Sequence, residues 1–175
     1  MPTIGVALAI PEPWATELQD YRTSVGDTTA TMIPTHITLI PPVEVGDTDL
    51  PKVEAHLEDV AGRTRGFCVH LRGTGTFRPL SPVVFVTVVE GISACEQLAG
   101  ALRRGPLSVN LQFPYHPHVT IAHHLPDDVL DRAFRDLATF ESVFDAEDFH
   151  LYVHDDHAGW QPTRKFPLLP APASA

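Results

Sequence analysis

Two short segments of the sequence hold a histidine and a threonine two positions apart, His36-Ile-Thr38 and His118-Val-Thr120. Side chains at positions i and i+2 of a β-strand point to the same face, so each segment presents an imidazole and a hydroxyl together. A neutral imidazole accepts a proton, a protonated imidazole donates one, and hydroxyl groups bind the oxygens of an anion. Two such pairs facing each other therefore predict acid–base chemistry on a bound phosphate.

The residues beside these four support a strand at each motif. Ile37 and Leu39 alternate with the first pair, and Val119 and Ile121 alternate with the second. Such alternation is typical of a strand with one face in the core. The two histidines are 82 positions apart in a chain of 175 residues. This repetition predicts two lobes that hold the motifs on either side of a central groove.

Prolines and glycines divide the chain into the elements that must position the motifs. Strands are expected at 3–10, 35–40, 67–77, 83–89, 118–123, 144–153 and 164–169. Helices are expected at 12–25, 49–62, 92–104 and 126–140, with a polar turn at 154–159 and a frayed tail at 170–175. Several strands follow one another directly, which favours an α+β fold with antiparallel sheets. Pro34 and the pair Pro41-Pro42 bracket strand 35–40, which predicts a short strand near a sheet edge or a site mouth.

Composition limits the class of protein. The chain is 43% hydrophobic and 19% charged, as in a folded soluble domain, and we expect one domain of two lobes over residues 1–175. The net charge of -10 argues against binding of long nucleic acid, but a small phosphate ester or short RNA end is compatible with it. Cys68 and Cys95 are expected to be buried free thiols. The apolar N-terminus is interpreted as a core strand, and we expect a cytoplasmic monomer with no membrane association.

The two motifs, Pro-Thr-His36-Ile-Thr38 and His-Pro-His118-Val-Thr120, resemble those of the 2H phosphoesterase superfamily. That superfamily contains the 2'-5' RNA ligase-like proteins and 2',3'-cyclic nucleotide phosphodiesterases, and the likeness extends from residue 3 to about residue 169. It implies a bilobal α+β fold with a pseudo-twofold axis, two antiparallel sheets flanking a cleft, and helices outside. It also implies a metal-independent phosphodiesterase without a cofactor. Its substrate would be a 2',3'-cyclic phosphate or a related nucleotide or RNA-end phosphodiester, with His36 and His118 as general acid and base.

The sequence departs from the family at two points. Many relatives have an arginine five residues after the second motif histidine, where this chain has His123. Relatives also often have a basic residue just before the strand at 83–89, where this chain has Ser81-Pro82. Histidine binds phosphate as a cation only when it is protonated. An alternative is therefore a nucleotide- or RNA-end-binding protein of the same fold with little turnover.

Other residues could complete the site. The expected substrate-binding residues are His123, Arg78 and Tyr115, and further candidates for positive charge or base stacking are Arg72, Arg164, Phe113 and Trp160. The histidines near residue 118 and between 150 and 157 also suggest a zinc site as an alternative. They lack a familiar two-plus-two ligand spacing, so we expect no metal.

Overall fold

The computed structural model describes residues 1–172 and has an α+β fold of two four-stranded antiparallel sheets. The strand order is β2-β1-β7-β8 in one sheet and β5-β4-β3-β6 in the other. The strands are β1 (Thr3–Ala9), β2 (His36–Glu44), β3 (Phe67–Thr76), β4 (Val83–Glu90), β5 (His118–His123), β6 (Glu141–Ala146), β7 (Asp148–Asp155) and β8 (Gly159–Pro167). The helices are α1 (Trp14–Ser24), α2 (Leu50–Arg63), α3 (Ile92–Leu102) and α4 (Asp127–Asp136), with a 3-10 turn, η1 (Gly105–Leu107). The expected fold class is confirmed.

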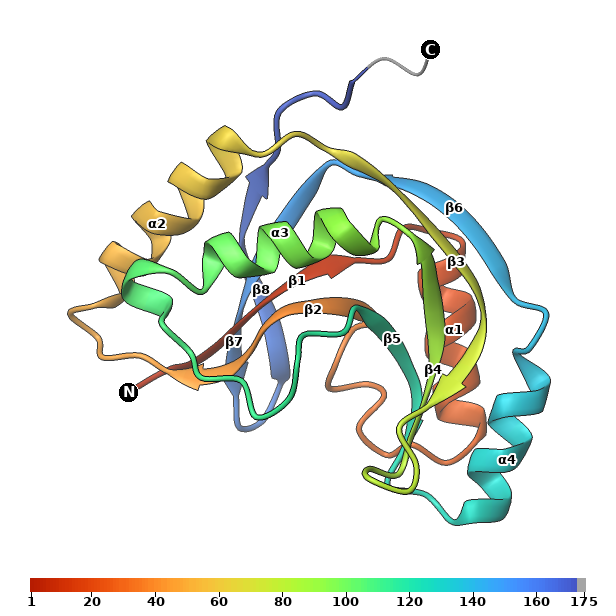
Figure 1. The fold of residues 1–175 in the computed structure, drawn as a ribbon. Helices are drawn as coiled ribbons and strands as arrows, with labels where there is room; N and C mark the ends of the chain where they lie inside the picture. The colour runs from red at the N-terminus through yellow and green to blue at the C-terminus, as the bar shows by residue number, and fades with distance from the viewer. Residues whose placement is uncertain (173–175) are drawn as a thin grey trace.

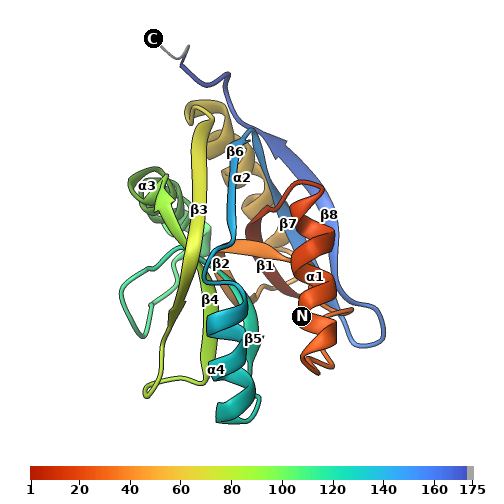
Figure 2. The ribbon, with the colours of Figure 1, turned by 90° about the vertical axis from the view of Figure 1, so that its right-hand side faces the viewer.

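The two motif strands occupy equivalent places in the two sheets. β2 is the edge strand beside β1, and β5 is the edge strand beside β4. The two edges lie next to each other near the middle of the molecule (Figure 1). Helix α3 packs near β2, and helix α1 packs near β5. Helix α4 covers β3 and β4, and α2 lies near β8, so helices flank both sheets (Figure 2).

The predicted alternation along the motif strands is confirmed. Ile37 and Leu39 of β2 are fully buried, as is Val119 of β5. The motif histidines and threonines are half-buried on the opposite faces of these strands. Burial of the aliphatic face favours a single register, because a slip of one residue would move every apolar side chain of the strand out of the core. The core thus fixes the direction in which the motifs point.

Strand β2 is longer than predicted, because it continues through Pro41 and Pro42 to Glu44. Its pairing with β1 is irregular at this point, where Ile40 pairs with Val6 and the next partner is Val43. The two prolines fall within this irregularity and on an edge strand, where a missing N–H costs little. The prediction that the strand lies at an edge is confirmed.

The C-terminal strands also differ from the predicted ranges. The single strand predicted at 144–153 is two strands, β6 and β7, which join different sheets and are separated at Glu147. β8 begins at Gly159 rather than at residue 164, and α4 ends at Asp136 rather than at residue 140. Both cysteines are free, but Cys68 is only partly buried. The predicted tail at 170–175 extends beyond the described residues. No helix within residues 1–172 is long and apolar enough to cross a membrane.

A close backbone contact holds the segment that leads into β2. Gly159 has a φ of +76°, and a Cβ at this position would lie 2.3 Å from the carbonyl oxygen of Met32. The N–H of Trp160 donates a hydrogen bond to the same oxygen at 2.8 Å. Only glycine combines this backbone conformation with so close an approach. The turn between β7 and β8 thereby anchors the residues immediately before His36.

Candidate active site

The orientation of His36 is set by its own strand. Its Nδ1 bonds to the carbonyl oxygen of Pro34, and its Nε2 lies 3.1 Å from Oγ1 of Thr38. A carbonyl oxygen can only accept a hydrogen bond, so Nδ1 carries the proton. In the neutral ring Nε2 is therefore the basic nitrogen, and the Thr38 hydroxyl can donate to it. The imidazole and the hydroxyl of the first motif thus lie on one face of the strand and contact each other.

His118 is held in the same manner on the other sheet. Its Nδ1 donates to the carbonyl oxygen of His116 at 2.7 Å, which again leaves Nε2 as the basic nitrogen. The edge of the ring meets Phe77, with centroids 4.9 Å apart, and Phe85 packs at 5.3 Å. Both motif histidines therefore use a carbonyl two residues earlier to fix the same tautomer.

Burial changes the acidity of both imidazoles. It lowers the pKa of His36 below 6.5, against a hydrogen bond to Pro34 that acts to raise it. It lowers the pKa of His118 in the same way, and the neighbouring imidazoles of His116 and His36 lower it further. Desolvation disfavours the charged form of an imidazole. Both rings are thus biased toward the neutral form at neutral pH.

Two pockets meet at His36. The first has an empty volume of about 500 Å³, part of it open to solvent, and it is largely apolar; its lining includes His36, Thr38, Tyr152 and Trp160. The second has an empty volume of about 480 Å³, also partly open to solvent, and is lined by Arg22, Ile33, His36, Val83, Thr120 and His123. The cleft therefore joins an aromatic cavity to a polar one, with the motif histidine of β2 between them.

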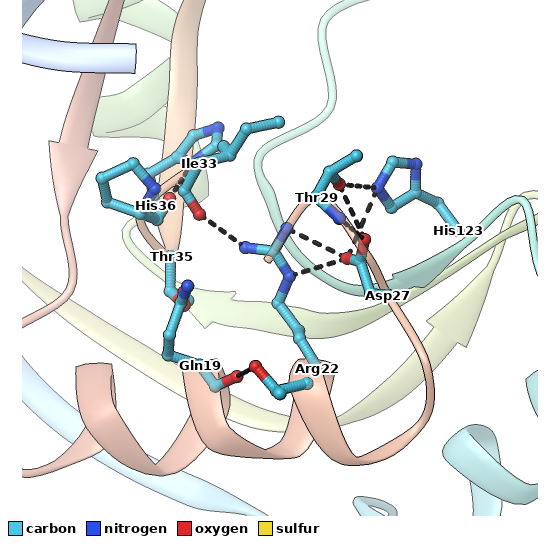
Figure 3. A network of polar contacts seen from close by, with 10 residues as sticks. Gln19, Arg22, Asp27, Thr29, Ile33, Thr35, His36 and His123 are labelled. Atoms are coloured by element: carbon cyan, nitrogen blue, oxygen red, sulfur yellow. Dashed lines mark hydrogen bonds and ion pairs between the residues drawn. The ribbon is translucent and has the colours of Figure 1, made fainter. Parts of the chain in front are cut away.

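Arg22, Asp27 and His123 form a network in the polar pocket (Figure 3). Nε and Nη2 of Arg22 donate to Oδ2 of Asp27 at 3.1 and 3.0 Å, and Nη1 donates to the carbonyl oxygen of Ile33 at 2.9 Å. Nε2 of His123 lies 3.5 Å from the same carboxylate oxygen and 3.3 Å from the Thr29 hydroxyl. Burial lowers the pKa of His123, although Asp27 acts to raise it.

Four of the seven predicted site residues line the two pockets: His36, Thr38, Thr120 and His123. His118 lines neither pocket, but it lies two residues before Thr120 on the same face of β5, the strand whose edge lies next to β2. The two motifs therefore lie on neighbouring strand edges, and His123 ends the second of these strands.

Tyr115 and Arg78 make contacts with the protein itself. The Tyr115 hydroxyl donates to the main-chain oxygen of Thr38 at 2.8 Å, which ties the segment before β5 to β2. Burial raises the pKa of Tyr115, so the hydroxyl stays a donor. Arg78 pairs with Asp131 of α4 at 2.8 Å, away from either pocket.

The other candidates have separate surroundings. Arg72 lies near Glu141, Arg164 pairs with Glu58, and Phe113 is exposed, while Trp160 lines the apolar pocket. Within residues 1–172 no group of three or more His, Cys, Asp or Glu side chains has a geometry that could hold a metal ion.

Sequence reasoning missed Arg22 and Asp27. Both are buried, with side chains 3% exposed, although charged residues are rarely buried unless paired. One signal was available. Arg22 lies four residues after Leu18, so the two share a face of α1, and that face is the buried one. A charged residue on a buried helix face indicates a buried partner or a ligand.

Comparison with known proteins places the chain in a family. Residues 10–158 match the model of the 2'-5' RNA ligase superfamily. A Halalkalibacterium halodurans protein named "Putative phosphoesterase" is 32% identical over 126 residues, 72% of each chain. A Bacillus cytotoxicus protein of the same designation is 28% identical over 141 residues, 78% of this chain and 80% of that one.

Solved structures share the fold. E. coli LigT in the apo form superimposes with a TM-score of 0.70 at 18% identity, covering 97% of this chain and 99% of LigT. TT0787 of Thermus thermophilus gives 0.69 at 23% identity, covering 96% and 98%. The α+β fold with paired His-x-Thr strands at one cleft is that of a 2H phosphoesterase. Within that class, the chain belongs to the 2'-5' RNA ligase superfamily.

Proposed function

We propose that the protein is a metal-independent phosphodiesterase that hydrolyses a 2',3'-cyclic phosphate or a related nucleotide or RNA-end phosphodiester. The observation that supports this most directly is the matched state of the two motif histidines. Each donates its Nδ1 proton to a carbonyl oxygen two residues earlier, so each offers Nε2 for chemistry. Two imidazoles of this kind at one cleft meet the requirement for a general acid and a general base.

The reaction requires one of the two motif histidines to be neutral and the other to be protonated. One neutral Nε2 accepts a proton from water as the water oxygen forms a bond to phosphorus. The other histidine is protonated and donates to the ribose oxygen as its bond to phosphorus breaks. In the substrate complex the Thr38 hydroxyl turns from Nε2 of His36 to a non-bridging oxygen, which frees Nε2 for proton transfer. Thr120 donates to a non-bridging oxygen in the same way, and the two hydroxyls hold the phosphate in line. Because His36 and His118 have the same tautomer, the scheme works with either of them as the base.

Replacing Thr38 alone tests the hydroxyl partner. Thr38→Val keeps the β-branched shape and removes the hydrogen bond to Nε2 of His36. We expect a loss of about 10- to 100-fold in kcat/KM for a 2',3'-cyclic nucleotide, since a neutral donor contributes less than a proton-transfer group. The variant Ile37→Val, on the buried face of the same strand, should leave kcat/KM unchanged and serves as the control. Equal activity of Thr38→Val and the wild type would show that the Thr38 hydroxyl has no role in the mechanism.

The apolar pocket supports a nucleotide as the substrate class. Its walls include the Trp160 indole and the Tyr152 ring, and it opens beside His36 and Thr38. Aromatic side chains bind nucleobases by stacking on their faces. E. coli LigT, the solved structure compared above, has been described in complexes with 3'-AMP, with ATP and with NADP+. A phosphate held by the two motifs would leave an attached base within reach of this pocket.

Trp160→Ala is expected to raise KM for a nucleotide substrate by about 5- to 150-fold, because a base–aromatic stack contributes about 1–3 kcal/mol. Steady-state kinetics on a 2',3'-cyclic mononucleotide would measure this. Ribose 2',3'-cyclic phosphate lacks the base, so its KM should change little. Phe113→Ala is the matched control, since Phe113 is an exposed aromatic that lines neither pocket. An equal loss on both substrates would contradict a base subsite at Trp160.

The pH dependence follows from the lowered pKa values of His36 and His118. Activity requires one neutral and one protonated ring, and with both pKa values below 6.5 the free protein is mostly doubly neutral at neutral pH. We expect kcat/KM to rise as pH falls from about 8, to reach its maximum below about pH 6.5 and to fall again when both rings are protonated. Bound phosphate stabilises the imidazolium form, so the kcat profile should lie at higher pH. A kcat/KM maximum above about pH 7.5 would contradict this assignment of acid and base.

The proposed function is tested with a panel of phosphodiesters. Cyclic mononucleotides, an RNA with a 2',3'-cyclic end and ADP-ribose 1'',2''-cyclic phosphate should be incubated with the wild-type protein, with and without EDTA. We expect hydrolysis of at least one, at the same rate in EDTA. Loss of activity in EDTA would exclude a metal-independent mechanism.

A binding protein with little turnover is the second candidate. It is favoured by the low pKa of His123, which makes that side chain a weak cation at neutral pH, and by the net charge of -10. Calorimetry would detect a bound nucleoside monophosphate whether the protein is a phosphodiesterase or a binding protein. Binding without product from any phosphodiester of the panel would support this second function.

A further inference from the structure

The polar pocket contains a buried cation that the acid–base scheme does not use. Arg22 extends from α1 and lines this pocket together with His36, Thr120 and His123. Its side chain is 3% exposed. A guanidinium remains charged at all relevant pH values, and burying a charge is costly unless its N–H groups find partners.

The hydrogen bonds of Arg22 leave part of the guanidinium available. It has five N–H groups, of which three donate to Asp27 and Ile33. The other two, on Nη1 and Nη2, have no partner among the described residues 1–172. Nε and Nη2 both donate to the same oxygen of Asp27, so the carboxylate contacts one side of the guanidinium. The end of the guanidinium formed by Nη1 and Nη2 does not contact the carboxylate along its outer edge. Figure 3 shows this end between His36 on one side and His123 on the other.

Asp27 fixes the guanidinium in this orientation. Burial acts to raise the pKa of Asp27, but hydrogen bonds from Thr29 and the charge of Arg22 prevail and lower it, so the carboxylate stays ionised. It accepts from Nε and Nη2 of Arg22, and the backbone of Ile33 accepts from Nη1. A guanidinium held at both sides is preorganised for an anion and loses little entropy on binding one.

The remaining groups around this pocket do not replace Arg22 as a cation. Burial lowers the pKa values of His36 on β2 and His123 on β5, and β4 contributes only the apolar Val83. Thr120 offers a neutral hydroxyl. Among the described residues that line the pocket, Arg22 is therefore the one with a permanent positive charge.

We propose that Arg22 binds a non-bridging oxygen of the substrate phosphate through its two unpartnered N–H groups. This inference rests on the proposed function, and it adds a residue from α1 to the two strand motifs. Arg22 binds and positions the phosphate and transfers no proton. The negative charge on the phosphate oxygens increases as water attacks, so an arginine at this position stabilises the transition state as well as the bound ligand.

The test removes the cation without leaving a buried carboxylate unpaired. In the double variant Arg22→Met with Asp27→Asn both charges are lost, the net charge is unchanged, and the new amide oxygen can still accept the hydrogen bonds from Thr29. The matched control is Arg63→Met with Asp59→Asn, the same exchange in an exposed pair on α2. Circular dichroism establishes that each variant is folded. Calorimetry with inorganic phosphate and kinetics with a 2',3'-cyclic mononucleotide then measure binding and turnover.

We expect the Arg22 double variant to bind inorganic phosphate about 10- to 100-fold more weakly, because hydrogen bonds to charged groups are the strong ones. Its kcat/KM should fall about 10²- to 10³-fold, the usual effect of removing one transition-state donor. The control variant should match the wild type in both. A folded Arg22 double variant with unchanged phosphate affinity would overturn the inference.

Two further outcomes are informative. If the Arg22 double variant does not fold, a crystal structure of the wild-type protein in inorganic phosphate decides the matter. A phosphate oxygen within hydrogen-bond distance of Nη1 or Nη2 supports the inference, and an empty pocket or a phosphate bound elsewhere contradicts it. If the wild type cleaves no phosphodiester but phosphate binding depends on Arg22, the proposed function fails while the inference stands.

Discussion

Replacing His36 or His118 by alanine is expected to lower kcat/KM for a 2',3'-cyclic nucleotide by about 10²- to 10⁴-fold, the contribution usual for general acid–base catalysis. The hydrogen bond at Nδ1 leaves Nε2 as the basic nitrogen of each ring, and alanine removes that nitrogen altogether. The two histidines act on one proton-transfer sequence, so the double variant should be little worse than the poorer single variant. Hydrolysis followed by chromatography of the nucleotide product would measure all three.

Folding should survive these changes. The aliphatic faces of β2 and β5 hold the strands in place, and the motif histidines lie on the opposite, half-buried faces. His157→Ala is the control, because His157 is exposed in the turn between β7 and β8 and contacts the rest of the turn through its backbone N–H. It should retain wild-type activity. An unchanged rate in either His36→Ala or His118→Ala would exclude that histidine as the acid or base.

The sequence was sufficient to predict the two motif strands and, for β2, a position near a sheet edge or a site mouth; it gave no such prediction for β5. Period-two alternation around His36 and His118 is a local signal, and prolines near β2 mark an edge. The boundary between β6 and β7 was not predictable in this way. Glu147 interrupts an otherwise strand-like run without glycine or proline, and the interruption exists because the chain there passes from one sheet to the other.

The strand motifs, His123 and Trp160 were named from the sequence as site candidates, whereas Arg22 and Asp27 were not. Arg22 and Asp27 are distant in sequence from both motifs, and they reach the cleft only because α1 packs near β5. Trp160 reaches it because the β7–β8 turn contacts Met32. These positions depend on tertiary packing, and the helical spacing of Leu18 and Arg22 does not by itself indicate which side chains α1 faces.

Arg22→Met alone is expected to lower the free energy of unfolding by about 3–5 kcal/mol, since it leaves a buried carboxylate without its partner. Asp27 is 3% exposed and has no other cation among the described residues within ion-pair distance except the weakly basic His123. Urea unfolding followed by circular dichroism at neutral pH would measure the change.

The double variant with Asp27→Asn should be more stable than Arg22→Met alone, because the second change removes the unpaired charge. A double-mutant cycle therefore predicts a coupling of more than about 1 kcal/mol between Arg22 and Asp27. The same cycle at the exposed pair Arg63 and Asp59 should give about 0–1 kcal/mol. The pKa of Asp27 is depressed in the folded state, so its contribution to stability is complete above pH 3.8 and is lost as pH falls below that value. Equal coupling at both pairs would mean that burial gives the Arg22–Asp27 pair no special role, and that the guanidinium is not held in place by its carboxylate.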